Sequence, residues 1–150
     1  MQNKCIFILL FQYSLKAPHK PISGSIADPV SFPLDSLAGS LEGELFQDMS
    51  WRLMYATDAS VYREIPLAVC FPKHAEDLQK IVQFCHEQDI HLIPRTAGTS
   101  LAGQVVGNGL IVDISRHMNR ILELNVEERW VKVEPGVILD ELNDYLKPYG

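Results

Sequence analysis

Residues 67–94 read LAVCFPKHAEDLQKIVQFCHEQDIHLIP, and their pattern of apolar residues indicates the fold class. Its first five residues, 67–71, form a continuous apolar run closed by Pro72, which is typical of a buried strand. Residues 74–88 follow with apolar side chains at helical spacing, and residues 90–94 return to strand character. A strand, a helix and a strand in this order predict a βαβ unit, in which the two strands lie parallel with a right-handed crossover.

The elements on both sides extend this unit into an α+β fold. Upstream, apolar residues spaced three and four apart predict a short amphipathic helix over residues 34–46, after a proline-rich irregular arm at 12–36. No element is assigned to residues 49–60. Downstream, the sequence predicts three strands and a final helix, at 110–114, 121–124, 129–134 and 137–147.

This order of elements predicts two segments. Residues 1–60 form an N-terminal arm and helical segment, and residues 61–150 form the main domain, in which the βαβ unit leads into a mixed sheet. Apolar residues make up 47% of the chain and charged residues 21%, so a packed core is expected.

The charge balance excludes one large class of partner. The 150 residues hold 13 Lys and Arg against 19 Asp and Glu, a formal net charge of −6. Nucleic-acid binding requires a basic face, and the positive residues here are scattered. We therefore expect no nucleic-acid partner.

The cysteines and histidines indicate neither disulfides nor a metal site. Cys5, Cys70 and Cys85 form no CxxC pair, and the five histidines lack HxxxH or HExxH spacing. The apolar run at residues 5–11 is far shorter than the about 20 residues of a membrane helix. It also has no convincing signal-peptide cleavage site. The sequence thus predicts a cytoplasmic protein without a membrane span.

The chemistry is expected in residues 95–104, which read RTAGTSLAGQ and directly follow the end of a strand. Their small side chains allow successive main-chain N–H groups to approach a ligand, as they do where proteins bind phosphate. Thr96, Thr99 and Ser100 add hydroxyl groups, and Arg95 adds a fixed positive charge. A pyrophosphate is the ligand that uses all three kinds of group.

Two common phosphate-binding motifs do not match this loop. Gly98 and Gly103 have the spacing of a P-loop, but Gln104 and Val105 follow where Lys and Ser or Thr are required. The GxGxxG spacing of dinucleotide-binding folds is absent. From the residues alone, an ordinary small-residue surface loop is as good an interpretation as a phosphate site.

Five blocks of sequence, taken together and in order, point to a known family. The blocks are PLAVCFP at 66–72, EDL at 76–78, IPRTAGTS at 93–100, GLIVDISRHMNRI at 109–121 and VKVEPGV at 131–137. They resemble the first half of the FAD-binding domain of the oxidases related to vanillyl-alcohol oxidase and p-cresol methylhydroxylase. Within this family the chain is most similar to the D-2-hydroxy-acid dehydrogenases, which include D-lactate, glycolate and D-2-hydroxyglutarate dehydrogenases. Residues 55–63, YATDASVYR, are similar to a segment of the large members that carry iron–sulfur modules.

The resemblance implies an FAD-dependent oxidoreductase that acts on a D-2-hydroxy acid. The loop that it implies for the FAD pyrophosphate consists of Pro94, Arg95, Thr96, Ala97, Gly98, Thr99, Ser100 and Leu101. Members that attach FAD covalently do so through a His at the position of Thr99, so we expect FAD to be held non-covalently. Many members have Gly where this chain has Thr96, and we expect Thr96 to keep ordinary backbone dihedral angles because a left-handed conformation would strain a β-branched residue.

The resemblance covers only part of a flavin domain, which in the family continues into further glycine-rich and substrate-binding segments. We assign no catalytic residue within the chain, and whether it is itself an enzyme stays open. Three interpretations follow: the FAD-binding portion of a D-2-hydroxy-acid oxidoreductase, an inactive remnant of one, or a subunit that completes its flavin site with a partner chain.

Overall fold

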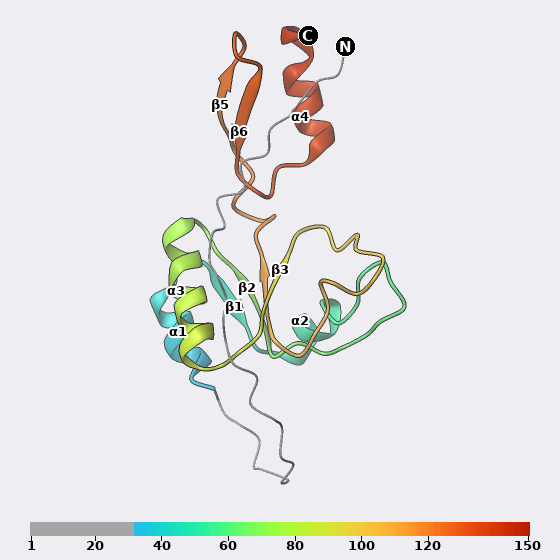
Figure 1. The fold of residues 1–150 in the computed structure, drawn as a ribbon. Helices are drawn as coiled ribbons and strands as arrows, with labels where there is room; N and C mark the ends of the chain where they lie inside the picture. Colours follow the sequence, from blue (N-terminus) through green and yellow to red (C-terminus); the bar gives the residue numbers. More distant parts are fainter. Residues whose placement is uncertain (1–31) are drawn as a thin grey trace.

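The computed structural model describes residues 32–150, and a four-stranded mixed sheet lies at its centre (Figure 1). The strands run in the order β1-β2-β4-β3. Their bounds are Glu44–Phe46 for β1, Ala68–Phe71 for β2, Leu92–Arg95 for β3 and Leu110–Asp113 for β4. Strands β2, β4 and β3 are parallel, and β1 is antiparallel to β2. The run at residues 5–11, and the proline-rich arm up to residue 31, lie outside the described residues.

The predicted βαβ unit is confirmed, with one strand inserted into it. Strand β2, helix α3 (Ala75–Glu87) and strand β3 follow one another in the chain, but β4 lies between the two strands and pairs with both. All four residues of β2 and of β4 are buried, whereas those of the edge strand β3 are partly exposed. Burial on both faces explains why β2 and β4 are continuous apolar runs rather than alternating ones.

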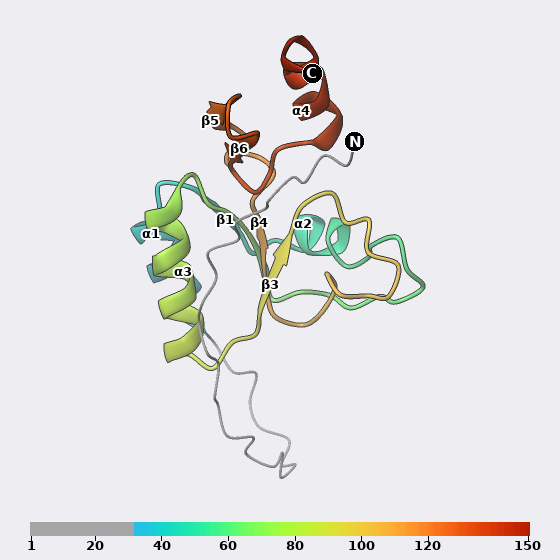
Figure 2. The same cartoon turned by 45° about the horizontal axis from the view of Figure 1, so that its top comes forward.

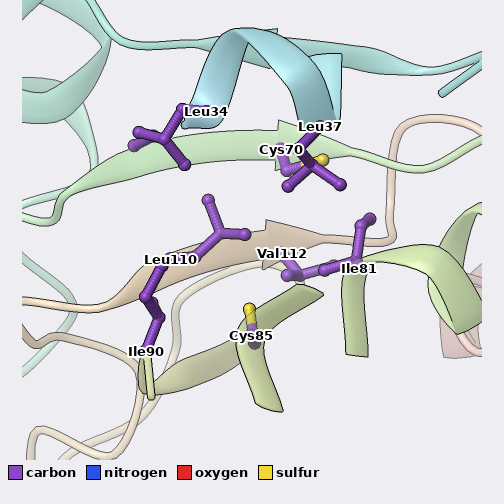
Figure 3. Packing of buried hydrophobic residues seen from close by; sticks show 9 residues of the cluster. Leu34, Leu37, Cys70, Ile81, Cys85, Ile90, Leu110 and Val112 are labelled. Atoms are coloured by element: carbon purple, nitrogen blue, oxygen red, sulfur yellow. The ribbon is translucent and has the colours of Figure 1, made fainter. Parts of the chain in front are cut away.

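Helices cover the two faces of the sheet (Figures 1 and 2). Helices α1 (Leu34–Ser40) and α3 pack on one face, where alternate strand residues such as Cys70 and Val112 meet Ile81 of α3 (Figure 3). Helix α2 (Met49–Met54) covers the other face, where Trp51 stacks on Phe46 with ring centroids 4.4 Å apart. The two faces of each strand therefore contribute to two separate apolar clusters.

The prediction of one helix over residues 34–46 is wrong in its second half. Helix α1 ends at Ser40, and residues 44–46 form strand β1. The buried carboxylate of Asp77 accepts hydrogen bonds from the main-chain N–H groups of Glu42 and Gly43, each at 3.0 Å, which holds the chain extended. A Cβ at Gly43 would lie 2.1 Å from the carbonyl oxygen of Phe71, so this close approach requires glycine.

Helix α2 was missed altogether, although its start carries a recognisable signal. Asp48 caps it, because its carboxylate accepts hydrogen bonds from the main-chain N–H groups of Ser50 and Trp51. The apolar residues of the helix do not mark a buried face, because Met49, Leu53 and Met54 are exposed. A short helix of this kind gives no clear amphipathic pattern.

The predicted C-terminal strands and helix are present beyond one end of the sheet (Figures 1 and 2). Strands β5 (Ile121–Asn125) and β6 (Trp130–Val133) form an antiparallel hairpin, followed by helix α4 (Leu139–Leu146) and a short 3₁₀ helix, η1 (Lys147–Tyr149). Arg120 closes the base of this hairpin, with Nη2 2.7 Å from Glu134 Oε1 and its main-chain N–H 2.8 Å from Glu134 Oε2.

Two buried carboxylates predict a pH-dependent stability. Burial alone would raise the pKa of Asp77, but hydrogen bonds from the N–H groups of Lys73, Glu42 and Gly43 lower the pKa overall. The hydrogen bond from Arg120 lowers the pKa of Glu134. Because both pKa values lie below their unfolded values of about 4, the stabilisation is complete above that pH and is lost as the pH falls through the folded values.

We therefore expect Asp77→Ala to reduce the free energy of unfolding by roughly 2–4 kcal/mol at pH 7, since it leaves three N–H donors without their acceptor. Asp77→Asn, which keeps one acceptor oxygen, should lose less. Urea unfolding between pH 7 and pH 3 measures both effects. A stability curve as steep in Asp77→Asn as in the unmodified chain would contradict the role given to this carboxylate.

Candidate functional site

The loop predicted to bind a ligand leaves the sheet at the carboxyl end of strand β3. It lines a hollow of about 600 Å³ together with the start of the chain that follows β4. Seven of the eight predicted residues line this hollow, namely Pro94, Arg95, Thr96, Gly98, Thr99, Ser100 and Leu101. Ala97 does not, and Gln104, Val105 and Ile114 complete the lining. The carboxyl end of parallel strands is where ligands bind in open α/β sheets.

The main-chain N–H groups of this loop are free for a ligand. Pairing between β3 and β4 ends where the carbonyl oxygen of Arg95 accepts from the N–H group of Ile114, at 3.1 Å. Beyond that point, no N–H group from Thr96 to Leu101 donates to any residue within 32–150. Consecutive unpaired N–H groups beside a hollow are the arrangement that binds anions in proteins.

Glycine is required at position 98 for two reasons. Its φ is +69°, a left-handed conformation that residues with a Cβ rarely adopt. A Cβ there would also lie 2.5 Å from Nη2 of Arg95. Among the described residues, the only non-glycine positions with positive φ are Asp89 and Arg129. The expectation of ordinary dihedral angles at Thr96 is therefore confirmed.

The guanidinium group of Arg95 is engaged by the protein. Its Nη2 atom donates to the carbonyl oxygen of Thr57 at 2.8 Å. Its Nη1 atom donates to the carbonyl oxygens of Tyr55 and Val105, both at 3.3 Å. The sequence predicted that Arg95 supplies a fixed positive charge to the ligand, whereas in the structure its N–H groups bind the main chain at residues 55–57 and at Val105.

The hydroxyl groups of the loop differ in their contacts. Ser100 Oγ contacts Gln104 Oε1 and accepts a hydrogen bond from the main-chain N–H group of Gln104 at 3.2 Å, which closes the turn of the loop. Thr96 and Thr99 are exposed, and their hydroxyl groups have no hydrogen-bond partner in the described part of the chain. These two hydroxyls are therefore available to a ligand.

Sequence reasoning missed the pair formed by Tyr55 and Asp113 beside the loop. The Tyr55 hydroxyl donates to Asp113 Oδ2 at 2.6 Å, and the Arg95 guanidinium lies 4.9 Å from the centre of the Tyr55 ring. Burial, and then the Asp113 carboxylate, raise the pKa of Tyr55, so it stays a hydrogen-bond donor at neutral pH. The signal available in the sequence was an acidic residue directly after the apolar run 110–112. In the structure this residue, Asp113, is only 5% exposed.

The other chemically reactive side chains are occupied elsewhere. His117, which follows strand β4, lies with Nε2 2.7 Å from Glu44 Oε2 on strand β1. Cys70 and Cys85 are free and buried, as expected of core residues, and burial raises the pKa of their thiols to about 12 and about 11. Residues 32–150 hold no cluster of three or more His, Cys, Asp or Glu fit for a metal ion.

None of the helices described has both the length and the apolar character needed to span a membrane.

Comparisons with known proteins connect this geometry to a family. A model of a family described as FAD binding domain matches residues 66–150. D-2-hydroxyglutarate dehydrogenase from Haemophilus influenzae is 47% identical over 112 residues, which is 73% of this chain and 11% of that protein. D-lactate dehydrogenase [cytochrome], mitochondrial, from Kluyveromyces lactis is 39% identical over 89 residues, 57% of this chain and 16% of that protein.

The fold itself recurs in a solved structure. A structure of alkyldihydroxyacetonephosphate synthase superimposes with a TM-score of 0.71 at 19% identity, covering 84% of this chain and 26% of that one. The predicted α+β fold class and the resemblance to the flavin-linked family are thus confirmed. The chain spans about a tenth to a sixth of the length of these two relatives.

We expect Gly98→Ala to destabilise the loop by about 1–2 kcal/mol, because alanine must adopt a left-handed conformation and displace the Arg95 side chain. Gly39→Ala is the matched control, since Gly39 lies in helix α1 and a Cβ there meets nothing within 4 Å. That substitution should be neutral or slightly stabilising. Urea unfolding of both variants checks the prediction, and equal stabilities would contradict it.

Proposed function

Residues 66–150 place this chain in the FAD binding domain family, and we propose that it is the FAD-binding part of a flavoenzyme that oxidises a D-2-hydroxy acid. FAD is held non-covalently, since Thr99 stands where covalent members of the family have His. D-2-hydroxyglutarate is the favoured substrate, on the basis of the 47% identical relative of that name. D-lactate is the alternative, after the 39% identical relative.

One observation carries this proposal: the unpaired main-chain N–H groups from Thr96 to Leu101 lie beside the hollow at the end of β3. A diphosphate carries negative charge on every phosphoryl group and accepts hydrogen bonds from such N–H groups. Gly98 leaves the loop without a Cβ at a position where no side chain fits. The hydroxyl groups of Thr96 and Thr99 supply further donors. The residues present therefore fit a diphosphate.

The flavin ring would supply the redox chemistry, taking up the hydride that leaves C2 of a 2-hydroxy acid while the hydroxyl group loses a proton, so that a 2-oxo acid forms. This chain contributes the binding and orientation of the cofactor's diphosphate. No residue of the chain is assigned to the removal of the hydroxyl proton or to the substrate.

The surface of helix α4 supports a further protein contact near the hairpin. Leu142 is buried, but Ile138, Leu139 and Tyr145 are 57%, 62% and 44% exposed. An apolar set of this kind on one short helix is typical of a face that another protein surface covers. We propose that protein from the same or a partner chain covers this face.

The purified chain is expected to bind FAD, and denaturation should release the flavin intact. Gly98→Ala should raise the dissociation constant for FAD at least tenfold, because it disturbs the loop, whereas Gly39→Ala should leave it unchanged. Titration of FAD fluorescence measures the constants, and the absorbance of the supernatant after acid precipitation reports the attachment. Equal binding by both variants would remove the loop from the site.

The chain alone is expected to give no flavin reduction with D-2-hydroxyglutarate, D-lactate or glycolate. The reason is that hydride removal requires residues that position the flavin ring and accept the hydroxyl proton, and we assign no residue of this chain to either task. Anaerobic spectra of the FAD-loaded chain, recorded after substrate is added, provide the test. Bleaching of the flavin absorbance with any of the three acids would refute this expectation.

A further inference from the structure

The Arg95 side chain is held by carbonyl oxygens of a segment that lies before the FAD-binding loop in the sequence. Two of its three acceptors, the carbonyl oxygens of Tyr55 and Thr57, belong to a segment that precedes the matched FAD binding domain. We call residues 55–62 the upstream segment. In Figures 1 and 2 the chain just before β2 and the chain just after β3 extend on the same side of the sheet.

The upstream segment has an organised structure of its own. The N–H group of Glu64 donates to the carbonyl oxygen of Ala56 at 3.0 Å, which closes the base of the segment. Asp58 Oδ1 accepts from the N–H group of Ser60 at 2.8 Å, and Ser60 Oγ accepts from the N–H group of Tyr62 at 3.1 Å. These hydrogen bonds fix the conformation of the upstream segment.

The upstream segment also contacts the loop directly, independently of Arg95. The N–H group of Ala59 donates to the carbonyl oxygen of Gly98 at 3.0 Å. Tyr62 packs so closely on the loop that a Cβ at Gly103 would lie 2.6 Å from its ring. Gly98 is therefore fixed by the hydrogen bond from Ala59, and the Arg95 guanidinium occupies the space that a Cβ at Gly98 would need.

Three of the five N–H groups of the Arg95 guanidinium donate to main-chain carbonyl oxygens and are therefore not available to a phosphate. Its five N–H donors allow a guanidinium group to hold several acceptors at fixed angles, which a lysine ammonium does not reproduce. The Tyr55 ring lies against the same guanidinium and is itself fixed by its hydrogen bond to Asp113. The arrangement immobilises Arg95 at the point where the β3–β4 pairing stops.

We propose that the upstream segment positions the FAD-binding loop, and that Arg95 acts as a positioning residue that ties the two together rather than as a ligand of the diphosphate. The proposal rests on the proposed function, because it concerns the same loop. It extends the cofactor site to residues 55–62, which lie outside the matched domain.

Two substitutions of Arg95 separate positioning from direct charge. Arg95→Lys keeps the positive charge but loses the geometry of the three hydrogen bonds, and Arg95→Ala loses both. If Arg95 positions the loop, both variants should bind FAD at least tenfold more weakly than the unmodified chain. FAD binding by Arg95→Lys within twofold of the unmodified chain, with Arg95→Ala much weaker, would overturn the proposal in favour of a direct charge.

A pair of variants in the upstream segment tests its role without touching the loop. Ala59→Pro removes the N–H group that donates to Gly98, whereas Ala59→Ser keeps it. Ala59→Pro should weaken FAD binding at least fivefold, and Ala59→Ser should bind as the unmodified chain does. Unchanged binding by Ala59→Pro would show that the upstream segment does not position the loop.

A measurement without FAD distinguishes this proposal from the proposed function. Trypsin cleaves after both Arg and Lys, and the bond after residue 95 is protected while the side chain is held. Cleavage there should be at least fivefold faster in Arg95→Lys and in Ala59→Pro, relative to the exposed Arg129 in the same chain. Equal cleavage with intact FAD binding would overturn the positioning role alone, whereas absence of FAD binding by the unmodified chain would overturn the proposed function.

Discussion

The pairing of β3 with β4 stops at Arg95, and the rest of the site depends on that ending. A parallel pair satisfies main-chain N–H groups only as far as the two strands run together. Ile114 makes the last such bond, and the chain from Thr96 to Leu101 then continues with its N–H groups free. Main-chain donors without a partner must face water or a ligand. The candidate site therefore lies where the pairing of β3 with β4 ends, and the residues of the loop determine its shape.

Buried carboxylates join the segments that surround this sheet. Asp77 ties the start of β1 to helix α3, Asp113 ties Tyr55 to strand β4, and Glu134 ties Arg120 to the base of the hairpin. Each accepts several hydrogen bonds, at least one of them from a residue 14 or more positions away, which compensates for the removal of its charge from water. The same device thus recurs at three junctions between elements.

Much of the fold could be predicted because its information is local. Strands β2 and β4 could be predicted from their runs of consecutive apolar residues. Helix α3 could be predicted from apolar residues that recur at helical spacing. Strand β1 could not be predicted, because it is three residues long and is fixed by Asp77, more than 30 positions away. The ligand loop was located from its small residues, but the engagement of Arg95 depends on the carbonyl oxygens of residues some 40 positions upstream. Such long-range contacts leave no periodic signature in the sequence.

The insertion of β4 between β2 and β3 has a consequence for the order in which this protein is assembled during synthesis. Strands β2 and β3 have no pairing with each other, so neither gains its central neighbour until residues 110–113 have left the ribosome. Closing these distant contacts is slow compared with forming helix α3. Nascent chains shorter than this point carry two unpaired parallel edges, which are exposed to misassociation. The ligand loop connects β3 to β4, so it can acquire its shape only once β4 has paired with β3.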